Sequence, residues 1–316
     1  MEFRTEIKQL QSSFSIDHHS DILMLGSCFS ENIGSRLQMY KFHCKINPFG
    51  TIFNPVSIAK LINWSLTDHR IIASELTQNL DLYFHYNMHS DLSSTDSEGL
   101  MMSINQTLDQ TAADLKSCDA LFVTLGSAIA YKHNDTGDIV ANCHKMPATI
   151  FTKQLLTIES SYQALYEAFA QIIAVNPRIN IVLTVSPVRH TRNGIVADHR
   201  SKARLVEISH AITDNLSNVS YFPSYELMMD DLRDYRYYEK DLIHPNEIAV
   251  DYIWEKFANL YLLPETQSLN QRIQKLLNAL NHRPKNTSST HYQTFVSKTK
   301  EEISALNVLL PKECCF

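Results

Sequence analysis

Short apolar runs of strand length alternate with segments of helical apolar spacing along most of this chain. The strand-like runs, rich in β-branched residues, lie at 21–26, 44–48, 120–125, 180–185 and 219–222. The segments with helical spacing lie at 30–39, 54–64, 160–175, 199–216 and 246–261. Strands that alternate with helices favour a parallel sheet covered by helices on both faces. The pattern therefore predicts an α/β fold with a central, mostly parallel sheet.

Two segments break this alternation. Residues 66–111 are polar and rich in Ser, Asp and His, which predicts an insertion or a cap. Residues 265–316 carry a helical pattern and then an irregular one, and we expect them to pack on the outside or to serve contacts between subunits. The predicted organisation is an α/β domain over 1–264, which contains the insertion, and a C-terminal extension over 265–316. A homo-oligomer stays open on this basis.

Three of only seven glycines, Gly26, Gly50 and Gly126, lie at the ends of apolar runs. Glycine suits positions where the backbone turns sharply or approaches a ligand closely. Ligands of open parallel sheets bind at the carboxyl ends of the strands. These glycines therefore predict three strand ends that face one site.

Ser27 and Cys28 follow Gly26, at the junction of a predicted strand and a predicted helix. The positive end of a helix dipole lowers the pKa of a thiol, and free N–H groups there can stabilise an oxyanion. On this interpretation Cys28 is a nucleophile. The alternative is that Ser27 caps the helix and Cys28 is a small buried apolar residue.

Asp241 and His244 place a carboxylate three positions before an imidazole. A carboxylate that holds an imidazole in one tautomer makes a general base. Pro245 disfavours helical geometry at His244, so we expect a loop that carries both groups over the sheet. The alternative is a loop histidine beside an Asp that caps a helix.

Further polar groups leave two interpretations open. Asn142 and His144 either donate to a substrate or an oxyanion, or form a polar loop. His85 and His89 would share one face of a helix, but no third ligand and no HExxH pattern accompany them, so we predict no metal.

A third set of polar groups lies around the later strands. Arg189 and His190 follow the buried run at 180–185, so they reach the carboxyl edge of the sheet. Segments 225–226 and 233–238 are dense in polar aromatic residues. They either line a substrate cleft or form the surface beside the site.

Composition narrows the classes of function. A net charge of −6 without a dense Lys/Arg run argues against a nucleic-acid partner. No apolar run approaches the ~20 residues that span a bilayer, and no signal peptide is visible, so we expect no membrane association. Six scattered cysteines without a CxxC pair predict reduced thiols and a cytoplasmic protein. No cofactor is predicted.

The segment Leu25-Gly26-Ser27-Cys28-Phe29-Ser30-Glu31-Asn32-Ile33-Gly34 resembles the signature of the GSCFA domain family, with Ser30 where Ala is more common. The agreement continues in order at 47–50, 89–90, 125–128, 142–145, 184–190, 201–203 and 241–245. It covers most of the chain from residue 21 to about 261. The resemblance implies a three-layer α/β/α fold like that of the SGNH/GDSL hydrolases, in a family largely without an assigned reaction.

The resemblance also implies roles for the first and last motifs. The wider SGNH group carries Gly-Asp-Ser-Leu after the first strand and Asp-x-x-His near the end. Registering Gly26 on the first of these places Ser27 at the Asp position and Cys28 at the position of the nucleophilic Ser. The implied triad is Cys28, His244 and Asp241, with Ser27 as the reserve nucleophile.

The same resemblance implies the groups that bind the oxyanion and the substrate. Gly50 matches the glycine after the second strand, and Gly126 opens a motif that is Gly-x-Asn in the wider group. Gly126-Ser127-Ala128 lacks that Asn, and Asn142 is the candidate to replace it. The full set of candidates is Gly50, Gly126, Ser127, Asn142, His144, His89 and His190.

These features support two classes of function. The first is an enzyme that hydrolyses esters or thioesters of a small-molecule or carbohydrate substrate, in which Cys28 attacks the acyl carbon, His244 moves the proton and Asp241 orients His244. A thioester acyl-enzyme also accepts an alcohol, so acyl transfer stays open. The second is a non-catalytic ligand-binding module on the same fold, because the Gly-x-Asn motif is incomplete.

Overall fold

Five parallel strands form the central sheet in the computed structural model, which describes residues 4–8, 10–282 and 289–316. In spatial order they are β10 (Val219–Phe222), β9 (Asn180–Val185), β5 (Ala120–Leu125), β1 (Ile22–Gly26) and β2 (Cys44–Ile46). Because the strands are parallel, their carboxyl ends meet at one edge of the sheet. This is the edge at which the glycine pattern predicts a site.

The strands are apolar because both faces of the sheet are covered. Every residue of β1 and β5 is buried. Leu121 and Val123 pack into one apolar core, whereas Ala120 and Phe122 pack into the core on the opposite face. Side chains alternate across a strand, so a continuous apolar run is what a sheet between two helical layers requires.

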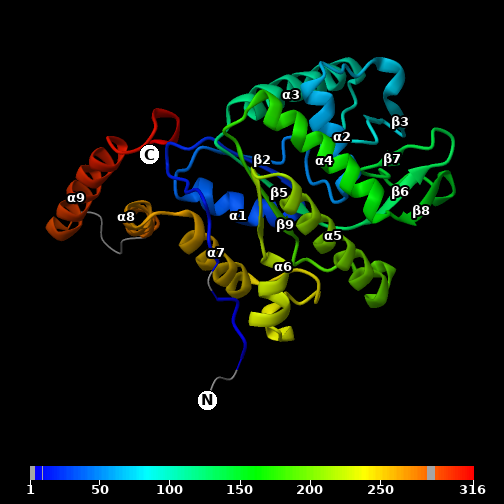
Figure 1. Cartoon of the computed structure of the whole chain (residues 1–316). Helices are drawn as coiled ribbons and strands as arrows, with labels where there is room; N and C mark the ends of the chain where they lie inside the picture. The colour runs from blue at the N-terminus through cyan, green and yellow to red at the C-terminus, as the bar shows by residue number, and fades with distance from the viewer. Residues whose placement is uncertain (1–3, 9, 283–288) are drawn as a thin grey trace.

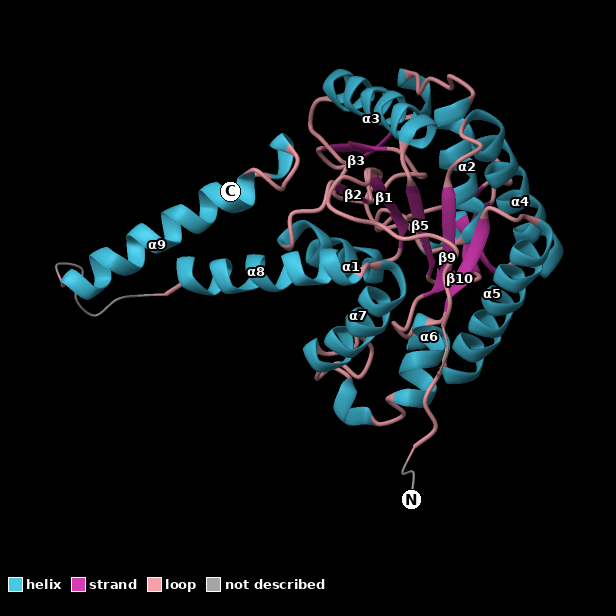
Figure 2. Ribbon diagram, turned by 60° about the vertical axis from the view of Figure 1, so that its left-hand side comes forward, coloured by secondary structure: helices cyan, strands magenta, loops and turns pink. Residues whose placement is uncertain are grey.

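Helices cover the two faces of the sheet (Figure 1). On one face lie α2 (Pro55–Leu66), α3 (Ser97–Ser117), α4 (Ile158–Val175) and α5 (Ile195–Asn215). On the other lie α1 (Cys28–Met39) and α7 (Glu247–Tyr261). Figure 2 shows the sheet between these layers, which confirms the predicted fold class, a three-layer α/β sandwich. The five strands and five helices that the apolar pattern predicts are present, with small shifts at their ends.

Helix α3 was missed, because it lies mostly within the polar segment 66–111. Its buried residues Leu100, Ile104 and Leu108 recur four positions apart, but polar residues between them dilute the pattern. The helix packs against α2 and α4. The later part of the segment predicted as an insertion therefore belongs to a helical layer, and the earlier part carries the hairpin β3 (Thr77–Asn79) and β4 (Leu82–Phe84).

A small antiparallel sheet follows β5 directly. It consists of β7 (Ile139–Val140), β6 (Ile129–His133) and β8 (Phe151–Leu155), in that spatial order. These strands are short and partly exposed, so no apolar pattern marked them in the sequence.

The C-terminal extension is a pair of helices that projects from the sandwich (Figure 2). The helices are α8 (Pro264–Leu280) and α9 (Thr290–Asn307), joined by a small core of Ile273, Leu276, Leu306 and Leu310. The sequence pattern predicts an irregular end here and misses α9. Within the described part of the chain, no helix combines the length and the apolar character that crossing a membrane requires.

Candidate active site

Strand β1 ends in a turn that admits only glycine. Gly26 has φ +126°, and a Cβ added to it would lie 2.1 Å from the carbonyl oxygen of Thr124 on β5. The next residue, Ser27, donates its N–H to that same oxygen at 3.0 Å. This close approach directs the chain from β1 into α1 at the carboxyl edge of the sheet.

We expect Gly26→Ala to lower the free energy of unfolding by about 3 kcal/mol, because the added methyl group both strains φ and overlaps the β5 backbone. Chemical denaturation measures the change. Gly137→Ala is the matched control, since Gly137 also has a positive φ but its added Cβ meets no atom closer than 3.5 Å. A loss no larger than that of Gly137→Ala would contradict the close packing at Gly26.

Ser27 and Cys28 have different tasks in the structure. The Ser27 side chain is fully buried and accepts a hydrogen bond from the Phe29 N–H at 3.2 Å, as a helix N-cap does. Cys28 is the first residue of α1 and is partly exposed. Of the two nucleophile candidates, Cys28 is therefore the one with access to a ligand.

The surroundings of Cys28 keep it protonated. Burial raises the pKa of the thiol, and the Glu31 carboxylate one helical turn further on raises it again. The N–H groups of Cys28 and Phe29 and the Lys202 ammonium act in the opposite direction. The lowering that the helix N-terminus predicts is present but is outweighed by burial, so the thiol needs a nearby base to react.

Asp241 and His244 form an oriented pair. The Asp241 Oδ2 lies 2.7 Å from the His244 Nδ1, and the Asp241 Oδ1 accepts the N–H groups of Ile243 and His244 at 2.8 and 3.0 Å. These bonds, with that to the His244 side chain largest, lower the pKa of Asp241 to about 2. When neutral His244 donates from Nδ1 to this carboxylate, its Nε2 is left as a proton acceptor.

The segment after β9 ties this pair to the carboxyl edge of the sheet. The Arg189 N–H donates to the Ile243 carbonyl at 3.1 Å, and the Arg189 Nη1 donates to the Leu242 carbonyl at 3.0 Å. The adjacent His190 is mostly buried, and burial, followed by the charges of Lys202 and His244, lowers its pKa to about 3. Its Nε2 has no hydrogen-bond partner among the residues that the structure describes. His190 is therefore neutral, and the charges of Lys202 and His244 both disfavour its protonation.

Lys202 is a site residue that the sequence reasoning missed. It is 1% exposed on α5, and its Nζ donates to the carbonyls of Gly126 and Ser186 at 2.8 and 2.6 Å. Burial lowers its pKa to about 8. The sequence held a signal, because Asp198, Lys202 and Leu205 follow helical spacing on the buried stripe of α5.

Several candidate oxyanion donors are already engaged. The N–H groups of Gly126 and Ser127 both donate to the Phe53 carbonyl, at 2.8 and 3.0 Å, and the Gly50 N–H donates to Asn47 at 2.7 Å. Gly126 still lies beside the nucleophile segment, since a Cβ on it would come within 3.3 Å of the Ser27 Cβ.

The Ser127 hydroxyl and the Cys28 N–H are the remaining candidate donors. The Ser127 hydroxyl accepts the Ile129 N–H at 3.0 Å and lies 3.3 Å from the Ser201 hydroxyl. The Cys28 N–H, at the first position of α1, makes no intrahelical bond and lies against its own sulfur. Of the backbone donors considered, Cys28 offers the one available to an oxyanion.

Asn142 and His144 lie against the turn at 85–88, and His89 follows that turn. The His144 Nε2 lies 3.1 Å from the carbonyls of His85 and Met88, and Asn142 accepts the His144 N–H at 2.8 Å. His89 packs against Gly50, where an added Cβ would lie 2.2 Å from the His89 Cβ. His144 is buried and holds the 85–88 turn in place. Within the described chain, no hydrogen bond joins these three residues to Cys28 or His244, and no group of three potential metal ligands is present.

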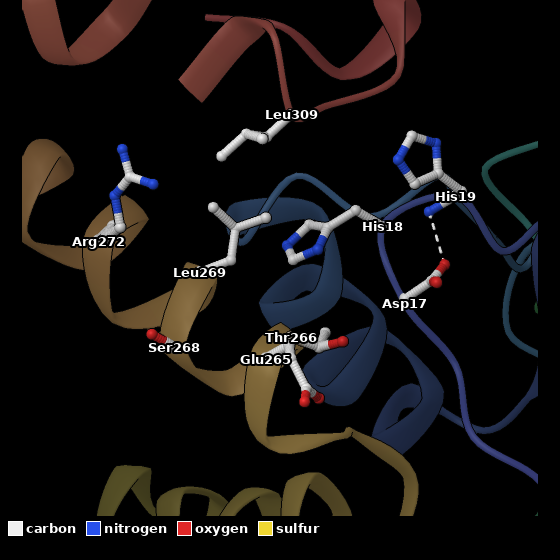
Figure 3. A pocket seen from close by; sticks show the side chains of 9 residues that line it. All are labelled: Asp17, His18, His19, Glu265, Thr266, Ser268, Leu269, Arg272 and Leu309. Atoms are coloured by element: carbon white, nitrogen blue, oxygen red, sulfur yellow. Dashed lines mark hydrogen bonds between the residues drawn. The ribbon is translucent and has the colours of Figure 1, made fainter. Parts of the chain in front are cut away.

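A cavity of about 310 Å³ lies at the opposite edge of the sheet (Figure 3). Asp17, His18 and His19, which line it, precede the start of β1, and the remaining lining residues come from α8 and Leu309. The His18 ring stacks on Phe42 and bonds to Asn270, and burial lowers its pKa. The cavity is therefore remote from the strand ends that carry Cys28 and is not part of the candidate site.

The fold and the site together define an α/β sandwich with a helix-start cysteine and an Asp–His pair at the carboxyl edge of its sheet. A model of the GSCFA family matches residues 21–257, and a model described as the GSCFA domain protein, C-terminal domain, matches residues 273–313. The chain therefore belongs to the GSCFA family. A comparison with curated proteins finds no match.

Proposed function

We propose that this protein is a cysteine-dependent acyl-transfer enzyme of the SGNH/GDSL type, acting on ester or thioester bonds of a small-molecule or carbohydrate substrate. The observation that supports it best is the Asp241–His244 pair. Arg189 bonds the loop of this pair to the carboxyl edge of the sheet, the edge at which α1 begins with Cys28. The fold supports the superfamily, because the nucleophile, the orienting carboxylate and the base follow one another along the chain in the order of the SGNH motifs, on a parallel sheet. The six free cysteines suit a reducing, cytoplasmic location.

The reaction begins with loss of the thiol proton. His244 Nε2 accepts the proton of Cys28 while the Cys28 sulfur attacks the acyl carbon, and a tetrahedral oxyanion forms. The intermediate collapses, the bond to the leaving alcohol or thiol breaks, and that group takes the proton from His244. Water or a second alcohol then attacks the thioester with His244 again as the base, which releases the acid or the new ester and restores the thiol.

Two groups are available to hold the oxyanion. The Cys28 N–H lies at the N-terminus of α1, where the helix dipole also favours negative charge. The half-buried His190 is neutral, and its Nε2 lacks a partner among the described residues. In its Nε2–H tautomer it donates to the oxyanion in place of the Asn that the Gly126 motif lacks.

Thiol labelling at neutral pH tests the activated nucleophile. We expect iodoacetamide to modify Cys28 faster than Cys143, a partly buried thiol whose pKa burial raises to about 11. His244→Ala should slow the labelling of Cys28 at least ~10-fold, because the thiol then loses its base. Peptide mass spectrometry measures each site separately.

His19→Ala is the matched control for this test, since His19 is exposed at the opposite edge of the sheet. It should leave the labelling rate of Cys28 unchanged. If Cys28 and Cys143 are labelled at equal rates and His244→Ala changes neither rate, His244 does not act as the base for Cys28.

A ligand-binding module without turnover is the second candidate function. The observation that favours it is the engagement of the Gly50, Gly126 and Ser127 N–H groups by carbonyls of the chain itself. It predicts that ligands bind equally well to the wild type and to Cys28→Ala, and that no ester in a panel yields a covalent acyl adduct detectable by intact mass.

A further inference from the structure

A second cavity lies beside the candidate active site. Its volume is about 240 Å³, and its walls come from the segment after β9, the start of α5 and the chain that follows β10. Ile195, Tyr225, Met228 and Met229 form its apolar lining, while Tyr235 and Tyr238 add aromatic walls. Such a pocket suits a compact ligand with an apolar or aromatic body.

The polar groups of this pocket are balanced except at one position. The Asp198 carboxylate, 4% exposed, accepts the His190 N–H at 3.1 Å, and its negative charge favours the ammonium form of the buried Lys202. Arg233 forms an ion pair with Asp230, and Asp234 lies 3.8 Å from the Nε of Arg236. The carboxylates of Asp230 and Asp234 therefore each have an arginine partner, and that of Asp198 is held by the His190 N–H.

Arg189 is the exception. Its guanidinium lies over the rings of Tyr235 and Tyr238, at 5.7 and 5.5 Å from their centroids, and its Nη1 donates to the Leu242 carbonyl. Among the described residues it forms no ion pair with a carboxylate. The rings hold the guanidinium plane in place, and most of its five N–H donors remain for a ligand.

We infer that this pocket binds a part of the substrate that carries an anionic group, a carboxylate or a phosphate, on an apolar or aromatic body, with Arg189 as the anion ligand. Guanidinium binds such oxyanions through paired hydrogen bonds, and a partly enclosed, aromatic setting strengthens them. The inference rests on the proposed function only in that it calls the ligand a substrate. Binding to the pocket itself requires no reaction at Cys28.

Arg189 connects the pocket to the loop that carries the proposed base. The same side chain that would hold the anion also bonds to Leu242, inside the Asp241–His244 loop. A substrate anchored at Arg189 is thus held next to the loop that carries the base. Anchoring of this kind raises the effective concentration of the acyl bond at the site.

Calorimetric titration with three ligands of nearly equal shape tests the inference: 4-phenylbutanoate, 4-phenylbutanamide and 4-phenylbutylamine. We expect the carboxylate to bind the wild type at least ~10-fold more tightly than the amide, with the amine weakest. This comparison needs no variant, so it does not depend on how Arg189→Met folds. Amide or amine binding as tight as that of the carboxylate would overturn the inference.

Variants then locate the anion. Arg189→Met should remove the advantage of the carboxylate over the amide, whereas Arg200→Met, an exposed arginine of α5 that does not line the pocket, should preserve it. Retention of the full advantage in Arg189→Met would also overturn the inference. Cys28→Ala should bind all three ligands as the wild type does, so an inert Cys28 would defeat the proposed function while leaving the binding result intact.

Discussion

Cys28→Ala should abolish acyl turnover, with a loss of about 10⁴-fold or more, because Cys28 is the accessible nucleophile candidate and the Ser27 hydroxyl beside it is buried as the cap of α1. Cys28 is partly exposed at the first position of α1, so its replacement by Ala leaves the packing of the helix intact. The measurement is release of the alcohol from a panel of esters and thioesters, combined with thermal unfolding to show that the variant is folded.

Ser27→Ala is the matched control for this prediction. The Ser27 hydroxyl caps α1 through the Phe29 N–H, so its removal should lower the free energy of unfolding by about 1 kcal/mol while turnover persists. The reverse result, turnover that survives Cys28→Ala and disappears in Ser27→Ala, would make Ser27 the nucleophile. That outcome would require the buried Ser27 side chain to leave its capping position.

The ends of the strands could be predicted because they depend on residues that are close together in the sequence. An apolar run followed by Gly26 has one low-energy arrangement in a covered parallel sheet, with the turn at the carboxyl edge. The Asp241–His244 contact was also accessible, since a spacing of three residues in a loop brings the two side chains together. In both cases the partners are close in sequence.

The remaining parts of the site depend on contacts between distant segments. The carbonyl of Phe53 accepts the N–H groups of both Gly126 and Ser127, and nothing in either segment specifies that meeting. In the same way, residue type predicts that His144 can donate to a ligand, but its ring instead bonds to carbonyls of the 85–88 turn. Polar residues that support a neighbouring loop and polar residues that contact a substrate look alike in sequence.

Lys202 supplies the second large expected effect, a dependence of stability on pH. Its pKa is about 8 in the folded protein, against an ordinary value of 10.5, because burial disfavours the ammonium form. Between these two values the unfolded chain binds more protons than the folded one, so folding becomes more favourable as the pH rises. The cost of burying the charge is fully present below pH 8 and disappears as the pH passes 10.5.

The contribution of Lys202 to the pH dependence must be separated from that of the titratable groups near it. The negative charge of Asp198 favours the ammonium form of Lys202, and His190, with a pKa of about 3 in the folded protein, does not titrate there in this range. Cys28 does titrate in the unfolded chain near pH 9, so both proteins compared should carry Cys28→Ala. The comparison is then between this background and the same background with Lys202→Met.

From pH 7 to pH 9.5, we expect the free energy of unfolding of the lysine-containing protein to rise by about 2 kcal/mol relative to the Lys202→Met protein. Urea denaturation at several pH values gives the difference directly, and the effects of the other titrating groups, which both proteins share, cancel in it. Lys202→Met also leaves the carbonyls of Gly126 and Ser186 without their donor, which shifts the difference at every pH but not its slope. A difference that is constant with pH would mean that Lys202 keeps its ordinary pKa and that its ammonium is better solvated than its 1% exposure indicates.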